Sequence, residues 1–225
     1  MDPARAPARL VVLLTVLVSG MAVTIVSANE IFFSEYVEGS EGLGVWNKAL
    51  EIYNPTAAVV NAWVEEIRID IHHDGSPTPT GAISYGNGSN FLLNPGDTFV
   101  LVQITADSTF INRADDTVLL LSDVDGNDAL VLRRGGVIVD VIGQIGFDPG
   151  PAGWGSGETT TANHTLRRKP FACDGDVDGS DLFNPESEWD GFPIDTFDGL
   201  GSHINDCQPN PTQATTWGGV KALHR

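Results

Sequence analysis

The chain has 225 residues with 30 acidic and 12 basic side chains, and its net charge at pH 7 is −18. A charge of that sign and size opposes binding to nucleic acids or anionic lipids, and it suits association with multivalent cations. The length allows one domain with a sizeable core and is too short for two ordinary domains.

The first 28 residues have the pattern of a secretory signal peptide. Arg5 and Arg9 precede the apolar run 10–18, and the small residues at 26–28 form a cleavage signature. An uncleaved N-terminal anchor is the alternative, and no later segment is apolar enough to span a bilayer. We therefore expect residues 29–225 to be exported to the medium, the periplasm or the cell surface. Removal of the leader makes the net charge one unit more negative.

Export permits disulfide bonds, and the chain has two cysteines, Cys173 and Cys207. We expect them to pair, because closing a loop of that length stabilises the fold by about 3–4 kcal/mol in the chain-entropy model. Two free thiols are the alternative.

The first strands are expected at 31–37 and 48–54. Leu50 and Ile52 alternate with Ala49, Glu51 and Tyr53, which is the period of a strand with one face in a core. A Gly-rich connection joins the two segments, so the sequence predicts a hairpin that ends at an Asn-Pro turn.

Further strands follow at fairly regular spacing. They are expected within 58–71, with a register break near 65–66, at 91–93 and 98–102 around an Asn-Pro-Gly-Asp turn, at 117–121, at 129–133 with 137–142, and at 161–169. Residues 72–90 and 143–157 are expected to be loops, and 106–114 a short helical turn. Residues 171–207 have little periodicity but several aromatic side chains, and we expect an ordered wrap stapled by the disulfide. Residues 208–225 are expected to be a linker and short tail. The pattern predicts an all-β antiparallel sandwich over 29–207.

Several ordered segments together resemble the lamin-tail domain, in its secreted bacterial branch. They are Leu-Glu-Ile-Tyr-Asn at 50–54, Leu-Asn-Pro-Gly-Asp-Thr-Phe-Val-Leu-Val at 93–102, Asp-Ala-Leu-Val-Leu at 128–132, Val-Asp-Val-Ile-Gly at 139–143, Asn-His-Thr-Leu-Arg-Arg-Lys at 163–169, Glu-Trp at 188–189 and the stretch 195–203. The resemblance covers nearly all of residues 29–207. It implies an immunoglobulin-like β-sandwich that acts as a binding or scaffolding module, and it supplies no catalytic residues.

An acidic loop carries the strongest local signal for a metal. Alternating carboxylates followed by Gly can wrap oxygens around Ca²⁺, which takes six to eight of them, and the spacing matches the first half of an EF-hand loop. The second half departs from it, because position twelve is a proline and the last acid would be Glu186 or Glu188. The predicted ligands are Asp174, Asp176, Asp178, Asp181 and Glu186. A solvated acidic turn is the alternative.

Five basic residues fall in two short stretches: Arg133, Arg134, Arg167, Arg168 and Lys169. If the two strands were neighbours, these side chains would form a basic patch able to contact a phosphate or another anion. Pairing with the many acids of the chain is the favoured alternative, because the overall charge opposes polyanion binding.

The sequence thus predicts a secreted, non-catalytic binding or structural module, stabilised by calcium, whose partner is an unidentified protein or cell-surface ligand. One rival is an accessory or vestigial part of an extracellular nuclease or other hydrolase. Another is a carbohydrate-binding sandwich, which a row of exposed tryptophans at Trp46, Trp63 or Trp154 would favour and burial of all three would exclude.

Overall fold

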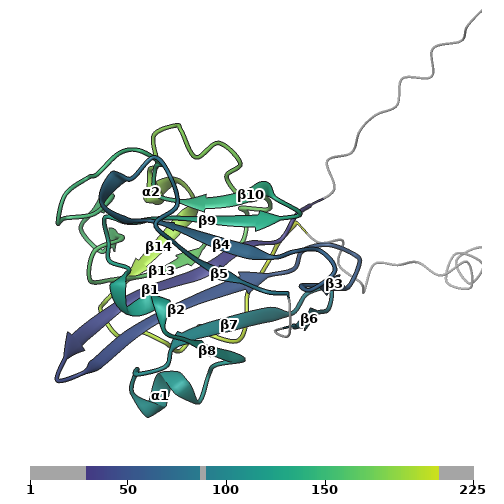
Figure 1. Ribbon diagram of the computed structural model, residues 1–225, viewed down its shortest axis with the longest axis horizontal. Helices are drawn as coiled ribbons and strands as arrows, with labels where there is room; N and C mark the ends of the chain where they lie inside the picture. Colours follow the sequence, from purple (N-terminus) through teal and green to yellow (C-terminus); the bar gives the residue numbers. More distant parts are fainter. Residues whose placement is uncertain (1–28, 87–89, 208–225) are drawn as a thin grey trace, which may run out of the picture.

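The structure, a computed structural model, describes residues 29–86 and 90–207; the predicted leader and tail lie outside this part of the chain. The fold is mainly β, as the sequence predicts (Figure 1). The strands are β1 (Phe32–Gly42), β2 (Val45–Tyr53), β3 (Val60–Asn61), β4 (Arg68–His72), β5 (Gly81–Ser84), β6 (Leu92–Leu93), β7 (Thr98–Gln103), β8 (Asp116–Val118), β9 (Ala129–Arg134), β10 (Val137–Ile142), β11 (Gly155–Ser156), β12 (Thr159–Thr160), β13 (Thr165–Arg168) and β14 (Trp189–Phe192). The short helices are η1 (His73–Gly75), α1 (Ser108–Ile111), η2 (Leu120–Asp123) and α2 (Pro185–Glu188).

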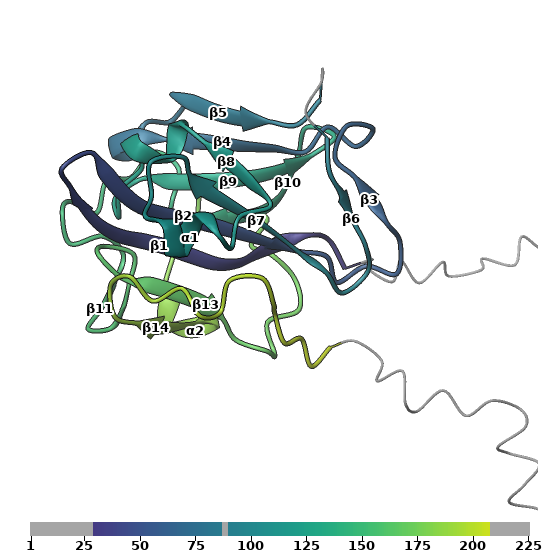
Figure 2. The same cartoon turned by 90° about the horizontal axis from the view of Figure 1, so that it is seen from below.

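Two larger sheets form the body of the molecule. One has six strands in the order β14-β13-β1-β2-β7-β8, and the other has four in the order β10-β9-β4-β5. Figure 2 shows the four-stranded sheet as a separate layer above β1 and β2. A single cluster of buried side chains draws on both sheets, including Phe33, Leu50, Ile69, Leu101 and Leu132, so the main core lies between the two layers.

The first hairpin is longer than the sequence predicts. β1 and β2 stay paired through the Gly-rich stretch, and only Leu43 and Gly44, both with positive φ, make the turn. Gly39 lies inside β1, where a Cβ atom would overlap the backbone oxygen of Asn47. Gly39 therefore allows the two strands to pack closely, whereas the sequence pattern predicts that it belongs to a loop.

The six-stranded sheet is buried on both faces, whereas the alternation in β2 predicts one solvated face. On the second face Val37, Ala49 and Val100 form a separate apolar cluster with Phe110 and Leu200. The C-terminal segment 193–207, named here the strap, supplies Leu200, and Figure 2 shows it (yellow) on the side of the sheet that faces away from β4 and β5. The predicted wrap is therefore a second layer over the sheet.

Several elements differ from the sequence prediction, including β11 inside the predicted 143–157 loop and η2 in place of the end of the predicted 117–121 strand. β5 forms inside the predicted 72–90 loop and pairs with β4, and β14 adds a strand beside β13 within the predicted wrap. β8 pairs with β7 in parallel, so the sheet is not wholly antiparallel. The chain from 104 to 115, which contains α1, makes the crossover that a parallel pair requires.

A buried ion pair connects the two sheets and the wrap. Asp140 on β10 is fully buried and accepts hydrogen bonds from Phe33 N (2.7 Å) and Asp176 N (2.8 Å). Arg168 Nη2 on β13 donates to both of its carboxylate oxygens at 2.9 Å. Burial raises the pKa of Asp140 to about 6 against the opposing effect of Arg168, so the carboxylate is mostly ionised at pH 7.

Arg168 is also enclosed by aromatic rings and by the acidic loop. Its guanidinium carbon lies 4.6 Å from the ring of Trp189 and 5.1 Å from that of Phe32, and Nη1 donates to Asp174 O at 2.9 Å. A cation enclosed in this way gains from each ring quadrupole because little water competes.

Cys173 and Cys207 form a disulfide, as predicted. The bond ties the end of the strap to the segment that follows β13, so the wrap is closed at both ends. No cysteine within the described residues is free.

Replacing Arg168 tests whether the buried pair supports the fold. Arg168→Met leaves Asp140 buried without its cation, and the free energy of unfolding at pH 7.5 should fall by about 3–5 kcal/mol in urea denaturation. The matched control is Lys169→Met, because Lys169 reaches Asp190 only at 4.0 Å and at the surface. It should change stability by less than about 1 kcal/mol.

Adding Asp140→Asn to Arg168→Met removes both charges and should recover part of the loss. Equal losses for the arginine and lysine variants would contradict a special role for the buried pair.

Candidate functional site

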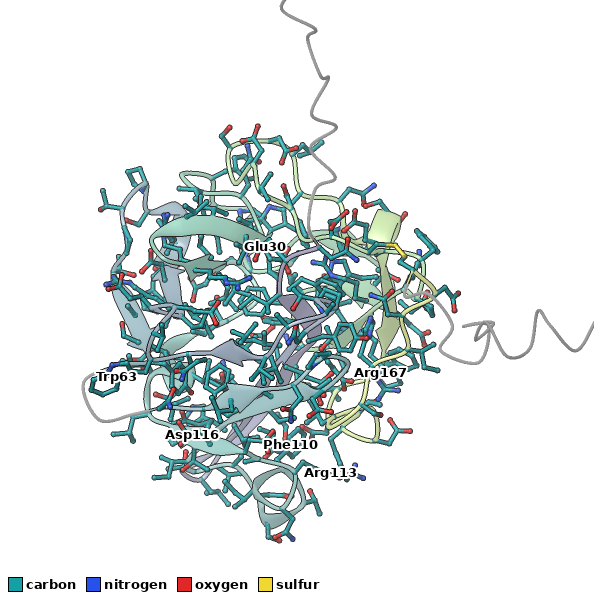
Figure 3. The ribbon with its side chains drawn as sticks, turned by 90° about the vertical axis from the view of Figure 1, so that its right-hand side faces the viewer. Glu30, Trp63, Phe110, Arg113, Asp116 and Arg167 are labelled. Carbon is teal, nitrogen blue, oxygen red and sulfur yellow. A yellow bond between two sulfur atoms is a disulfide. The ribbon has the colours of Figure 1, made fainter. Side chains whose placement is uncertain are left out.

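A wide hollow lies at the β7–β8 edge of the six-stranded sheet and is named here the edge cleft. Its volume is about 820 Å³, within the range usual for small-ligand sites. The lining residues come from the segment after β5, from β6, β7 and the turn between them, from the crossover and β8, and from the strap: Tyr85, Asn90, Phe91, Leu92, Leu93, Gly96, Asp97, Thr98, Phe99, Arg113, Asp115, Asp116, Gly201, Ser202 and His203. In Figure 3, Asp116 and Arg113 lie on the face turned toward the viewer, and Trp63 lies at its margin.

Three aromatic rings form a fixed wall of the edge cleft. The rings of Phe91 and Phe99 stack with their centroids 3.8 Å apart, and Tyr85 meets them edge-on at 4.8 Å and 5.6 Å. The Tyr85 hydroxyl donates to Asp116 Oδ2 at 3.1 Å. Burial and the Asp116 carboxylate raise the pKa of Tyr85, so it remains a neutral donor.

The other wall is polar and carries charges of both signs. Asp115 Oδ2 accepts a hydrogen bond from Val100 N (2.8 Å), which holds this exposed carboxylate at the end of the crossover. Arg113 Nη1 donates to Leu200 O at 3.1 Å, so the guanidinium spans from the crossover to the strap. The wall therefore offers acceptors and donors side by side.

His203 contributes a neutral imidazole to the same cleft. Burial, with a smaller effect of Arg168, lowers its pKa to about 4, and its ring packs on Tyr53 (4.8 Å) and Phe32 (5.6 Å). Its Nε2 has no hydrogen-bond partner among the residues that the structure describes. The histidine is thus packed against aromatic rings.

Trp63 stands beside the cleft. It is 48% exposed and lines an adjoining hollow of about 400 Å³ that shares Tyr85 with the edge cleft. Trp46, on β2, is partly exposed, and Trp154 is buried at 4%. The three tryptophans therefore do not form an exposed row, and they are not all buried either, so the carbohydrate reading depends on Trp63 alone.

The acidic loop is organised by its own hydrogen bonds. Asp176 Oδ1 accepts from Asp178 N (2.9 Å), and Asp178 Oδ1 accepts from Ser180 N (3.1 Å) and Ser180 Oγ (2.6 Å). The predicted ligand Glu186 instead faces β11, where its Oε1 accepts from Ser156 Oγ at 2.8 Å. Hydrogen bonds within the loop therefore support its turn.

A different set of acids from this region comes together. Asp176, Asp181 and Glu188 line a hollow of about 230 Å³, with Arg168 in the same wall. Burial raises the pKa of Asp176, and the charges of Asp181 and Glu188 add to the effect. Within residues 29–86 and 90–207, however, no three His, Cys, Asp or Glu side chains are grouped closely enough to hold a metal ion. Calcium at this loop stays a prediction.

The five basic residues singled out in the sequence all have carboxylate partners. Arg133 pairs with Asp70 (2.7 Å), Arg134 with Glu30 (2.5 Å) and Glu65 (2.6 Å), Arg167 with Glu35 (3.0 Å) and Asp198, Arg168 with Asp140 (2.9 Å) and Glu188 (3.3 Å), and Lys169 with Asp190 (4.0 Å). The first two are on β9 and the next two on β13, and these strands belong to different sheets. The two basic stretches are therefore not on neighbouring strands.

Sequence reasoning missed the residues that build the edge cleft. Phe91 and Phe99 lie on either side of the predicted turn at 94–97. Their positions indicate that both side chains lie at the same end of a pair of strands. Tyr85 falls in a predicted loop, and Asp115 and Asp116 lie between predicted elements. Their proximity depends on the crossover and on β5, neither of which has a clear sequence signal.

Comparison of the chain with protein-family models, curated proteins and solved structures finds no match. In the part of the chain that the structure describes, the helices are all too short and too polar to cross a membrane. The function must therefore be inferred from the residues of this chain and their geometry.

Thermal melts in EDTA and in Ca²⁺ test the acidic loop. An ion that binds only the folded state, present at 100 times its dissociation constant, adds about 2.7 kcal/mol. Calcium binding by the loop predicts a midpoint several degrees higher in Ca²⁺, and Asp176→Asn with Asp178→Asn should abolish the increase. Asp97→Asn, in the edge cleft, is the control and should keep it. Equal midpoints in the two buffers would make the loop a self-contained acidic turn.

Proposed function

We propose that this chain is an exported, non-catalytic binding module that holds its ligand in the edge cleft. The observation that carries the proposal is the cleft itself, in which a rigid aromatic wall faces a wall of hydrogen-bond donors and acceptors. Ligand sites commonly combine an apolar surface with a few polar groups that fix orientation. Both walls are attached to sheet strands, so the geometry is set before a ligand arrives.

The scaffold is, in this proposal, an immunoglobulin-like sandwich of the lamin-tail type. Its support is that the segments of the resemblance fall on sheet strands, including β2, β7, β9, β10 and β13. The packing of a four-stranded sheet on a six-stranded sheet agrees with that architecture. Because one fold serves many functions, the ligand must be argued from the cleft.

Export and calcium complete the proposal. The leader-like residues 1–28 and the Cys173–Cys207 disulfide both suit an oxidising compartment outside the cytoplasm. Calcium is proposed for the acidic loop on its sequence spacing, with a stabilising role. The partner is then a ligand on a cell surface or in the surrounding medium.

A carbohydrate is the ligand that the cleft suits best. Sugars present hydroxyls that both donate and accept, and the polar wall offers the guanidinium of Arg113 beside the carboxylate of Asp115. They also present apolar C–H faces, for which the half-exposed ring of Trp63 is a suitable platform. A neutral sugar pays no electrostatic penalty on approaching an acidic protein.

Titration with soluble oligosaccharides tests the proposal. Cello-, chito- and xylo-oligosaccharides are added while tryptophan fluorescence is followed, and at least one series should bind. Trp63→Ala should weaken that binding by tenfold or more, equivalent to about 1.4 kcal/mol. Trp46→Ala is the matched control, because Trp46 is a partly exposed tryptophan far along β2 from the cleft, and it should leave the affinity unchanged.

Other outcomes discriminate between the rivals. If the two tryptophan variants lost the same amount of affinity, sugar binding at the edge cleft would be contradicted. Binding of oligolysine, with no binding of sugars, would support a binding module whose ligand is a cationic peptide and would contradict the carbohydrate proposal. Hydrolysis of a nucleic acid or phosphodiester in Ca²⁺ or Mg²⁺ would contradict the non-catalytic proposal and favour the nuclease reading.

A further inference from the structure

Two carboxylates face each other beneath the strap. Glu35 on β1 and Glu51 on β2 are direct register partners and are only 2% and 1% exposed. Side chains opposite one another on neighbouring strands lie close together, and like charges in that arrangement repel. Burial strengthens the repulsion because water cannot screen it.

The two carboxylates are not equally satisfied. Glu51 accepts a hydrogen bond from Ser34 Oγ and another from Gly201 N, each at 2.6 Å. Glu35 Oε2 accepts from Arg167 Nε at 3.0 Å, whereas Glu35 Oε1 is buried without a partner among the described residues. An ionised Glu35 would leave a buried anionic oxygen without a donor, which favours the protonated form.

The strap rests directly on this pair. A Cβ atom at Gly199 would overlap Glu35 Oε2 and Arg167 Nε, so the strap backbone approaches these two side chains closely. Asp198 pairs with Arg167, and Gly201 donates to Glu51. The polar contacts of the strap therefore converge on the same few side chains as the carboxylate pair.

One guanidinium contacts two of the three carboxylates at this place. Arg167 contacts Glu35 and Asp198, and Glu51 lies beside Glu35. Asp190 on β14 is the register partner of Arg167 but is largely exposed, and the ring of Phe192 covers the guanidinium at 4.3 Å. A proton held by Glu35 or Glu51 reduces the excess of negative charge under the strap.

We propose that the strap is a pH-dependent latch, closed while Glu35 is protonated and opened when a rise in pH ionises Glu35 beside Glu51. Gly201, Ser202 and His203 belong to a wall of the edge cleft, so opening the latch would remove part of that wall. The effect of the latch on ligand binding rests on the proposed function, whereas the opening of the strap does not. The disulfide at Cys207 keeps the far end of the strap attached when it opens.

The sign of the pH effect follows from burial. Burial raises the pKa of Glu35 to about 8, with Glu51 and Asp198 adding to the shift and Arg167 opposing it; burial also raises the pKa of Glu51. Because the pKa of Glu35 is higher under the closed strap than in an exposed glutamate, protonation of Glu35 stabilises the closed strap. This stabilisation is fully present below the ordinary glutamate pKa and is lost as pH rises through about 8. If the open strap restores an ordinary glutamate, the opening equilibrium should increase roughly tenfold between pH 7 and pH 9.

Hydrogen exchange of strap peptides tests the latch without any ligand. Exchange is measured by mass spectrometry from pH 6.5 to 9.5, and each variant is compared with wild type at the same pH to cancel intrinsic exchange. Glu35→Gln cannot ionise, so the ratio of strap protection in the variant to that in wild type should increase roughly tenfold between pH 7 and pH 9. Glu66→Gln, at an exposed glutamate far from the strap, should match wild type at every pH.

A second measurement covers the case in which Glu35→Gln fails to fold. Carboxyl ¹³C NMR of wild-type protein labelled at glutamate should show one resonance that titrates near pH 8. Titration of every glutamate below pH 6 would overturn the latch, as would a ratio of strap protection between Glu35→Gln and wild type that is the same at pH 7 and pH 9. Neither result bears on oligosaccharide binding at pH 6.5, so failure of the latch and failure of the proposed function are distinguishable.

Discussion

The ion pair between Asp140 and Arg168 joins every layer of the molecule. Asp140 lies in the four-stranded sheet, and it binds Arg168 and the backbone of β1 in the six-stranded sheet. The same carboxylate accepts from Asp176 N, and Arg168 donates to Asp174 O, so the acidic loop is held at this point as well. Desolvating two charges is costly, and the cost is offset here because both partners have additional hydrogen bonds and aromatic contacts.

The strap gives the six-stranded sheet a second buried face, and this face has a mixed character. Its apolar part, around Val100 and Leu200, stabilises the strap at any pH. Its polar part places Glu35 and Glu51 under the strap backbone, which approaches Glu35 closely at Gly199. A segment held by both kinds of contact can loosen locally while the rest of the fold stays intact, because local opening exposes few apolar side chains.

The edge cleft is bordered by the strap. Its aromatic residues are Tyr85, Phe91 and Phe99, its acidic residues are Asp97, Asp115 and Asp116, and the strap supplies its last wall. The buried ion pair keeps the sheets in register, and the strap decides how much of the cleft is closed. Function in this proposal therefore depends on a rigid scaffold together with one segment of lower stability, a common division in binding proteins.

The sequence by itself determined a mainly β fold, because alternation in 48–54 and 137–142 and the turn at 94–97 are local signals. It also determined the disulfide, since only two cysteines are present. Tertiary structure alone decided that Glu51 is buried, because alternation separates the two faces of a strand but does not say what covers either one. The same reason hides the edge cleft: its residues run from 85 to 203, and only the packing of β5, the crossover and the strap brings them together.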